Sequence, residues 1–270
     1  MEEGSELKIW KYLDLAKFIS LLTTNTLYFA SPAQFQDLSE GSLPKSHADA
    51  WSKFIQESIV DPNQALRPQF AARSPAALKQ FDYIQQKLVR ELPKAQREAT
   101  LRFGVSCWHK SEYESEAMWK LYSASGQGVA IESSVGQLRS SLGSTEGIQI
   151  ASVRYADFDN DPIEKGHKHY GLFLKKKSFE HEKELRATIL LPSEQFSLPA
   201  NERGIAVDCN LSLLINNIYV SPLCAPYVAS AVESLCRGKI TVLEKPVIHS
   251  RLLSDRGYNI EISLPSYLSK

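Results

Sequence analysis

The feature of this sequence that most constrains its fold is the alternation of short apolar segments with helix-start signals. Apolar residues that alternate with a period of two are typical of strands, whereas apolar positions at i, i+3, i+4 and i+7 indicate helices. Both patterns recur along most of the chain, which predicts an α+β fold with a mixed, largely buried central sheet. Strands are expected at 7–13, 26–32, 102–108, 128–133, 147–156, 183–191, 204–211, 216–222 and 239–245.

The segment from about 46 to 101 has a different pattern, because it is helical in period and contains no strand signal. Ser74 and Pro75 are typical of a helix start. Pro93 is expected to end this second helix, since proline moves the residue before it out of the helical region. We therefore expect a helical insertion that covers one side of the sheet, within one domain that spans residues 1–270.

The charge balance excludes few classes of protein. The chain has 31 Lys and Arg and 31 Asp and Glu, so no basic excess points to nucleic acid, although a neutral total can hide a local patch. No apolar run is long enough to span a membrane, and the acidic start MEEGSELK lacks the apolar core of a signal peptide. These features predict a cytoplasmic protein without membrane contact. Four cysteines are widely spaced and are expected to be buried thiols, namely Cys107, Cys209, Cys224 and Cys236.

The stretch SFEHEKELRATILL, residues 178–191, carries the densest group of charges beside an apolar run. As a helix it would place Glu180 and Glu184 as like charges at i, i+4 and would have no clean apolar stripe. As a strand from residue 183 it has an apolar face that begins at Leu185 and a polar face with Glu184 and Arg186. We therefore predict a strand, with Glu182, Glu184 and Arg186 directed the same way.

Two carboxylates and a guanidinium on one strand face have three possible roles. The side chains can be solvated, they can form an internal ion-pair network, or they can line a pocket. In a pocket, a glutamate can bind a hydroxyl or act as a base, and the arginine can anchor a phosphate or carboxylate. The sequence alone leaves all three open.

Two other groups of polar residues are weaker candidates. His167, His169 and His181 have no recognised ligand spacing, so no metal site is predicted. The loop 31–41 contains Ser31, Asp37 and Glu40, which fit either a functional loop after a strand or ordinary turn chemistry. The chain contains no Walker loop, GxGxxG, GxSxG or HExxH motif.

Several segments in order resemble an uncharacterised bacterial family, known as a domain of unknown function and linked to phage defence and abortive infection. Its Lys-Tyr opening strand is matched by Lys11 and Tyr12, and its LYFSSPxxFNDPFE segment by LYFASPAQFQDLSEG. Its MWxxY…GVxI and ExExR motifs are matched by MWKLYSASGQGVAI and EHEKELR, with Lys177 before the latter. Gln36 and Leu38 depart from the family pattern, which has Asn and Pro there.

The opening layout, a strand, a helix and a strand that ends in serine, is also similar to the ADP-ribosyltransferase fold. This similarity implies an NAD-using site in a toxin-type or defence effector. Glu184 or Glu182 would be the catalytic carboxylate that orients the ribose. The residues implied to hold NAD are Lys11 or Tyr12, Ser31, Lys177 and Arg186.

Two other functions remain open. In a metal-dependent nuclease, Asp37, Glu182 and Glu184 would hold Mg²⁺. The altered loop at Gln36 and Leu38 favours the other alternative, a non-catalytic sensor or interaction module of a defence system. The partner is expected to be a protein or nucleic-acid target, with a further partner encoded in the same operon.

Overall fold

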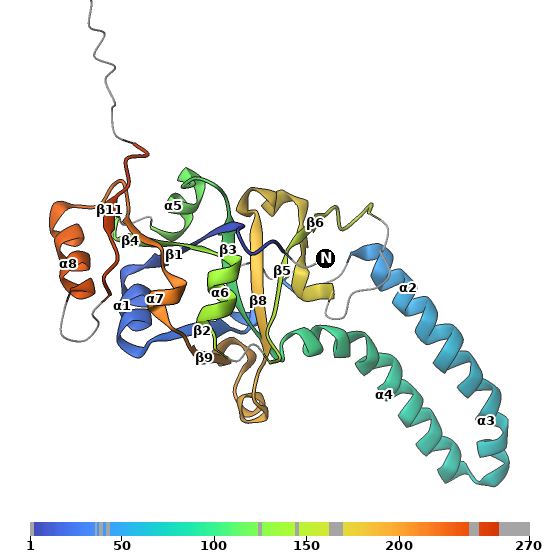
Figure 1. Ribbon diagram of the computed structural model, residues 1–270. Coiled ribbons are helices and arrows are strands. Elements are labelled where there is room, and N and C mark those ends of the chain that lie inside the picture. The colour runs from blue at the N-terminus through green and yellow to red at the C-terminus, as the bar shows by residue number, and fades with distance from the viewer. Residues whose placement is uncertain are drawn as a thin grey trace, which may run out of the picture.

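The structure, a computed structural model, describes residues 3–35, 37, 40–41, 44–123, 126–143, 146–161, 170–237 and 243–253. Within these residues the chain forms one α+β domain around a mixed nine-stranded sheet, as the sequence predicted (Figure 1). Its strands are β1 (Lys8–Asp14), β2 (Thr26–Ala30), β3 (Phe103–Lys110), β4 (Gly128–Ser134), β5 (Gln149–Ser152), β8 (Glu184–Leu190), β9 (Gly204–Asp208), β10 (Asn217–Val220) and β11 (Val247–His249). A separate two-stranded sheet pairs β6 (Arg154–Ala156) with β7 (Leu174–Lys176).

The main sheet branches at β3. Its order is β11-β10-β4-β1-β3-β2-β9, and β8 pairs with the other edge of β3 and carries β5 beyond it. On one edge of β3, His109 and Lys110 pair with β1, and Val105 pairs with β2. The strands β1 and β2 therefore share that edge, and the stretch of β3 between them faces a split in the sheet.

Helices begin and end where the sequence provides caps. The Asp14 carboxylate accepts a hydrogen bond from the Lys17 amide, and the chain leaves α1 through Asn25, whose φ is 52°. Ser74 and Ser115 cap α4 and α5 in the same way. The α-helices are α1 (Leu15–Thr24), α2 (Lys45–Ile55), α3 (Asp61–Arg73), α4 (Pro75–Thr100), α5 (Glu116–Tyr122), α6 (Val135–Ser141), α7 (Leu211–Leu214) and α8 (Pro226–Cys236).

Shorter helical segments connect these elements. A π-helical turn, Gln56–Val60, joins α2 to α3. The 3₁₀ segments are Pro32–Gln34, Tyr170–Phe173, Lys177–Glu182, Ser193–Ser197 and Ala200–Glu202.

The two faces of the sheet bury different sets of side chains. The larger core joins one face to α1, α6, α7 and α8, and it includes Ile9, Phe18, Trp108 and Leu185. A smaller cluster lies on the opposite face under α5 and consists of Trp10, Tyr12, Met118, Trp119 and Ala130. Glu184 and Arg186 of the candidate site lie on this second face.

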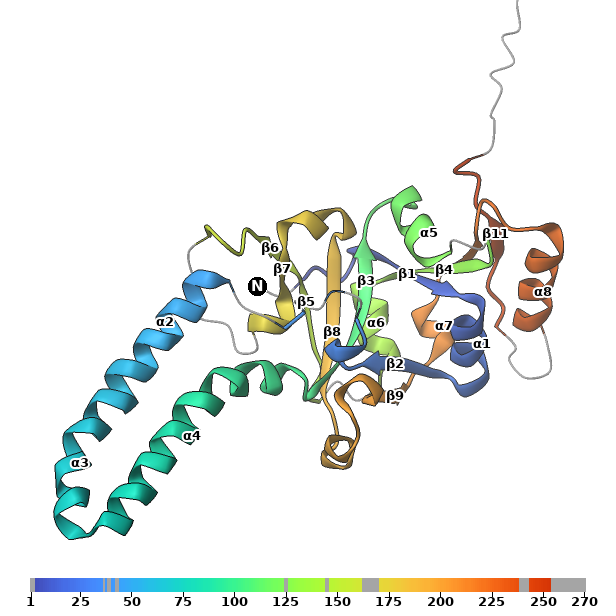
Figure 2. The same ribbon diagram turned by 180° about the vertical axis from the view of Figure 1, so that it is seen from behind.

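The insertion forms a long helical hairpin that extends away from the sheet (Figures 1 and 2). Our expectation that it covers one side of the sheet was therefore wrong. The hairpin packs mainly on itself, with the Phe70 and Phe81 rings stacked at 4.6 Å. Its two ends meet at the body, where a Cβ added to Gly41 would overlap the Thr100 side chain.

The structure differs from the expected element boundaries at three places. Helix α4 continues past Pro93 to Thr100, so the expected break was wrong; the helix-forming residues after the proline outweigh its local cost. The single strand expected at 147–156 is two strands, because β5 pairs with β8 whereas β6 pairs with β7. The strand expected at 239–245 lies mostly outside the described residues, and β11 follows it.

Candidate functional site

Strand β8 has the two faces that the sequence predicted. Leu185 and Ala187 belong to the larger core, whereas Glu184 and Arg186 lie on the other face. The register places Glu184 opposite His109, and Arg186 opposite Cys107. Glu184 and Arg186 are nearly inaccessible to solvent, with 5% and 1% of their surface exposed, so the solvated alternative is excluded for both.

Arg186 is the centre of a buried hydrogen-bond network. Its Nε and Nη2 donate to the two carboxylate oxygens of Glu184 at 3.0 and 2.9 Å. Its Nη1 and Nη2 donate to the two carboxylate oxygens of Glu40 at 3.0 and 2.9 Å, and Nη1 also donates to the Leu172 carbonyl at 2.7 Å. A guanidinium has five N–H donors, and these bonds use all five. Arg186 therefore has no donor left for a ligand.

Lys175 is a second buried cation in the same network. Its Nζ lies 2.6 Å from a carboxylate oxygen of Glu182, 3.3 Å from one of Glu40 and 3.7 Å from one of Glu184. Burial alone would lower the pKa of Lys175, but the charges of Glu184, Glu182 and Glu40 raise it. Lys175 is therefore charged at neutral pH. Together these five side chains, Glu40, Lys175, Glu182, Glu184 and Arg186, are called the charged cluster below.

A left-handed turn directs Glu182 and Glu184 toward the same cation. Lys183, between the 3₁₀ segment and β8, has a φ of 41°, an unusual value for a residue with a side chain. On its N-terminal side, the Glu182 carbonyl accepts a hydrogen bond from His109 Nδ1 at 2.6 Å. On its C-terminal side, the Glu184 amide donates to the Tyr155 hydroxyl at 2.7 Å. Both glutamates are thus held at their backbones as well as at their carboxylates.

Lys11 is a residue of β1 on the same face as Ile9 of the larger core, and its side chain reaches across the split toward β3, with Nζ 5.3 Å from the centre of the Trp108 ring. Its Nζ donates to Ser106 Oγ at 3.0 Å and to the Cys107 carbonyl at 3.1 Å, on the edge of β3 that neither neighbouring strand covers. Burial lowers the pKa of Lys11 to about 8, although Cys107 and Glu184 oppose this shift. Among the described residues Lys11 forms no ion pair, and its ammonium has one more N–H donor than these two bonds use.

The cluster keeps Glu184 ionised. Burial would raise the pKa of Glu184, but the charges and hydrogen bonds of Arg186 and the charge of Lys175 hold it below its ordinary value. The Cys107 thiol, opposite Arg186 on β3, lowers this pKa further. An ionised carboxylate accepts hydrogen bonds and stabilises positive charge, which is the chemistry that a sugar-transfer site requires.

The structure brings some of the predicted residues together and leaves others apart. Glu40, Glu182, Glu184 and Arg186 are in direct contact, as described above. The Tyr12 hydroxyl accepts a hydrogen bond from the Ser115 amide at 2.9 Å, and burial raises its pKa. Ser31 is buried, and its Oγ accepts a hydrogen bond from the Ala33 amide at 3.3 Å.

The remaining predicted residues lie outside the cluster or outside the description. Lys177 is exposed; its charge adds to the hydrogen bonds from Asn160 and Asp159 that lower the pKa of Asp157. The Asp37 carbonyl accepts a hydrogen bond from the Glu40 amide at 3.0 Å. His181 is exposed. Gln36, Leu38, His167 and His169 lie outside the described residues.

Sequence reasoning missed Lys175 and Cys107. Lys175 is the first of three consecutive lysines, and no local pattern indicates that it is the buried one. Cys107 was interpreted only as a buried thiol; it is half-buried, and the burial and the nearby Glu184 raise its pKa. The alternation of β3 could have placed Cys107 and His109 on one face, but their pairing with β8 is a long-range contact.

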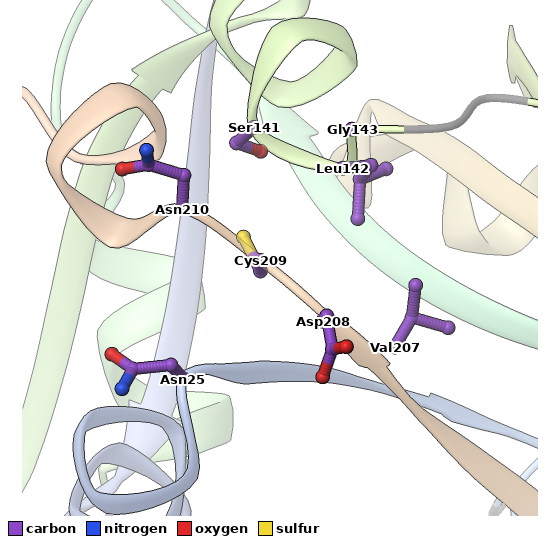
Figure 3. A pocket seen from close by; sticks show the side chains of 8 residues that line it. All are labelled: Asn25, Ser141, Leu142, Gly143, Val207, Asp208, Cys209 and Asn210. Carbon is purple, nitrogen blue, oxygen red and sulfur yellow. The ribbon is translucent and has the colours of Figure 1, made fainter.

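The described residues contain no group of three or more His, Cys, Asp and Glu side chains placed to hold a metal ion. A hollow of about 550 Å³ lies elsewhere, between the ends of α1, α6 and β9 (Figure 3). It is lined by residues that include Asn25, Ser141, Asp208 and Cys209, and by none of the charged cluster. This hollow therefore adds nothing to the candidate site.

Comparison of the chain with protein-family models, with curated protein sequences and with solved structures gives no match. The resemblances noted in the sequence therefore stay predictions. Across the part of the chain that the structure describes, none of the helices has the length and apolar character that crossing a bilayer requires.

Proposed function

We propose that the charged cluster and Lys11 form the active site of an NAD-using enzyme similar to ADP-ribosyltransferases. The observation that carries this proposal is the state of Glu184: a buried carboxylate that Arg186 and Lys175 hold ionised. The resemblance assigned the ribose-orienting role to this residue or to Glu182. We assign the role to Glu184, the carboxylate on strand β8 itself; its two oxygens also accept hydrogen bonds from Arg186 at 3.0 and 2.9 Å, so a ribose hydroxyl would bond to them alongside Arg186.

The contacts suggest different roles for Arg186 and Lys11, the two basic residues that the resemblance implied. All five N–H donors of Arg186 are hydrogen-bonded to protein acceptors, so Arg186 acts as a positioning residue that fixes Glu184. Lys11 retains an unused donor and a positive charge that influences Glu184, so it is the better candidate of the two to contact a diphosphate; its ammonium lies on the larger-core side of the split, beside Trp108. The residues present therefore fit NAD through Glu184 and Lys11, and not through Arg186.

NAD would supply the reactive bond, between nicotinamide and ribose, whose cleavage leaves positive charge on the sugar. Glu184 would accept a hydrogen bond from a ribose hydroxyl and stabilise that charge. Tyr12 lies on the same face and packs edge-on against His109, with ring centroids 6.2 Å apart. Its hydroxyl hydrogen is still available to donate, because the Ser115 bond uses only an acceptor position.

The test is NAD turnover by the purified chain. We expect the wild-type protein to bind NAD and release nicotinamide, and Glu184→Gln to lower the rate at least about 100-fold, as the loss of one electrostatic contact to a transition state does. Glu132→Gln is the matched control: Glu132 is a similarly buried carboxylate on the same sheet, paired with Lys8 outside the cluster. Absence of NAD binding and turnover, or equal losses in the two variants, would contradict the proposal.

We propose the biological role, a bacterial defence or toxin-type effector, on the resemblance alone. The saturated donors of Arg186 also favour the alternative of a non-catalytic sensor, because the network is complete without a ligand. Binding of NAD without nicotinamide release would select that alternative. Magnesium-dependent cleavage of DNA or RNA would select the nuclease alternative.

A further inference from the structure

Helix α4 carries basic side chains along one face. Counted at about 100° per residue, the spacing of these residues places them and one tyrosine within an arc of about 80°. The arc extends over about 27 Å of the helix at 1.5 Å per residue. All of these side chains are exposed; they are called the basic stripe below and comprise Lys79, Tyr83, Lys87, Arg90, Lys94 and Arg97.

The basic stripe faces away from the rest of the hairpin. Phe81, which is 8% exposed and stacks on Phe70, lies on the opposite side of α4. The acidic residue nearest to Phe81, Asp82, is bound through both carboxylate oxygens by Arg67 of α3 at 2.8 Å. The stripe is therefore oriented toward solvent by the packing of α4 on α3.

The stripe is not balanced by the acids beside it. Glu91 and Glu98 border one edge, and Glu91 pairs with Arg90 at 2.7 Å. The hydrogen bond from Arg90 and the charges of Lys94, Arg90 and Lys87 lower the pKa of Glu91, which reflects the positive surroundings. Five cations thus face two bordering carboxylates.

Charge is divided between the hairpin and the body. Residues 45–100 contain nine Lys and Arg and six Asp and Glu, a net charge of +3. The whole chain has 31 of each, so the other residues carry −3. The hairpin projects away from this acidic body (Figure 2). A basic surface held apart from an acidic one attracts a polyanion with little repulsion from the body.

The exposed Tyr83 ring indicates which kind of polyanion the basic stripe binds. Its side chain is 65% exposed and lies in the middle of the arc, between Lys79 and Lys87. Proteins that bind single-stranded nucleic acid combine cations that follow the backbone with exposed aromatic rings on which bases stack. We propose that the basic stripe of α4 binds the backbone of single-stranded nucleic acid, with one base stacked on Tyr83. This site is independent of the reaction proposed for the charged cluster.

The test uses the full chain and labelled 20-nucleotide oligo-uridine and oligo-thymidine, with binding followed by fluorescence anisotropy at several salt concentrations. Contact of five cations with phosphates predicts a slope of log K against log salt of about −3.5 for a single strand. The double variant Lys87→Gln/Lys94→Gln should reduce the size of that slope by about 1.4. Lys45→Gln/Lys53→Gln is the matched control, because it makes the same charge change on α2 of the same hairpin.

Tyr83 separates a specific site from general attraction. Tyr83→Ala should weaken binding about fivefold or more through loss of stacking, whereas Tyr83→Phe should bind as the wild type does. The proposal is overturned if the wild-type chain binds neither oligonucleotide at about 50 mM salt. Equal losses in the two double variants, or wild-type affinity in Tyr83→Ala, would overturn it as well. Far-ultraviolet circular dichroism would establish that each variant is folded.

Discussion

Arg186 and Glu40 lie 146 residues apart in the chain and are joined by two buried hydrogen bonds of 2.9 and 3.0 Å. This pair fastens the loop after β2 to the strand β8. The Phe35 ring of the same loop lies 5.7 Å from the Arg186 guanidinium. The loop and the strand that the sequence identified as separate candidates therefore form one structural unit.

The first prediction concerns the stability that Arg186 provides. Arg186→Met leaves Glu40 and Glu184 buried with fewer partners, and it should lower the free energy of unfolding by about 3–5 kcal/mol. Arg90→Met, at an exposed pair with Glu91, should change it far less, because solvent screens this pair. Urea unfolding followed by circular dichroism measures both. Similar values for the two variants would show that the buried network contributes little.

The second prediction concerns acid pH. Because the folded-state pKa of Glu184 is lowered, its stabilising contribution is present above the unfolded-state value near 4.5 and is lost as pH falls through the lower folded value. Glu184→Gln should therefore be less stable than the wild type at pH 7, and the difference should shrink below about pH 4. Urea unfolding of both chains at pH 7, 5 and 3.5 would reveal the convergence. A difference that is constant with pH would contradict it.

The third prediction concerns alkaline pH and Lys11. Its pKa falls from 10.5 to about 8 on folding, so below pH 8 the buried charge destabilises the folded state. Between pH 8 and 10.5 the unfolded state holds more protons, and stability from this residue should rise by about 3 kcal/mol. Lys11→Met lacks this rise. Since all other groups titrate in both chains, the difference between their unfolding free energies at pH 7.5 and 10 isolates the effect of Lys11.

The fourth prediction concerns Gly128 at the start of β4. A Cβ there would overlap the Ser123 side chain, whose hydroxyl bonds to Ser221. Gly128→Ala should therefore lower the unfolding free energy by about 1–3 kcal/mol through overpacking. Gly4→Ala, where no atom lies within 4 Å of the added group, is the control. Thermal unfolding should show a lower midpoint for the first variant alone.

The local part of the fold could be predicted from the sequence because it depends on local rules. The helix start at Ser74 was predicted and is observed, and Asp14 and Ser115 cap α1 and α5 by the same local rule. The alternation in 183–191 correctly assigned Leu185 and Glu184 to opposite faces. Such features depend on residues within one or two turns of each other.

The parts that failed depend on contacts distant in sequence. The strand at 147–156 divides because its first half pairs with β8 and its second half with β7, and neither partner is specified by the segment itself. In the same way, the burial of Lys175 depends on three glutamates of which the nearest, Glu182, is seven residues away. From sequence alone, charged residues of this kind are predicted to be solvent-exposed, because their buried partners are distant in the chain.

The end of α4 meets the chain segment that leads into α2 at one place on the body. Gly41, Thr100 and Gly171 are so close that a Cβ on Gly171 would lie 3.1 Å from the Gly41 carbonyl oxygen and 3.2 Å from the Thr100 methyl carbon. The chain thus leaves the body and returns to it at nearly the same point, so the hairpin is an insertion at a single site. Because both connections lie at this place, a longer or shorter hairpin would leave the order of the strands in the sheet unchanged.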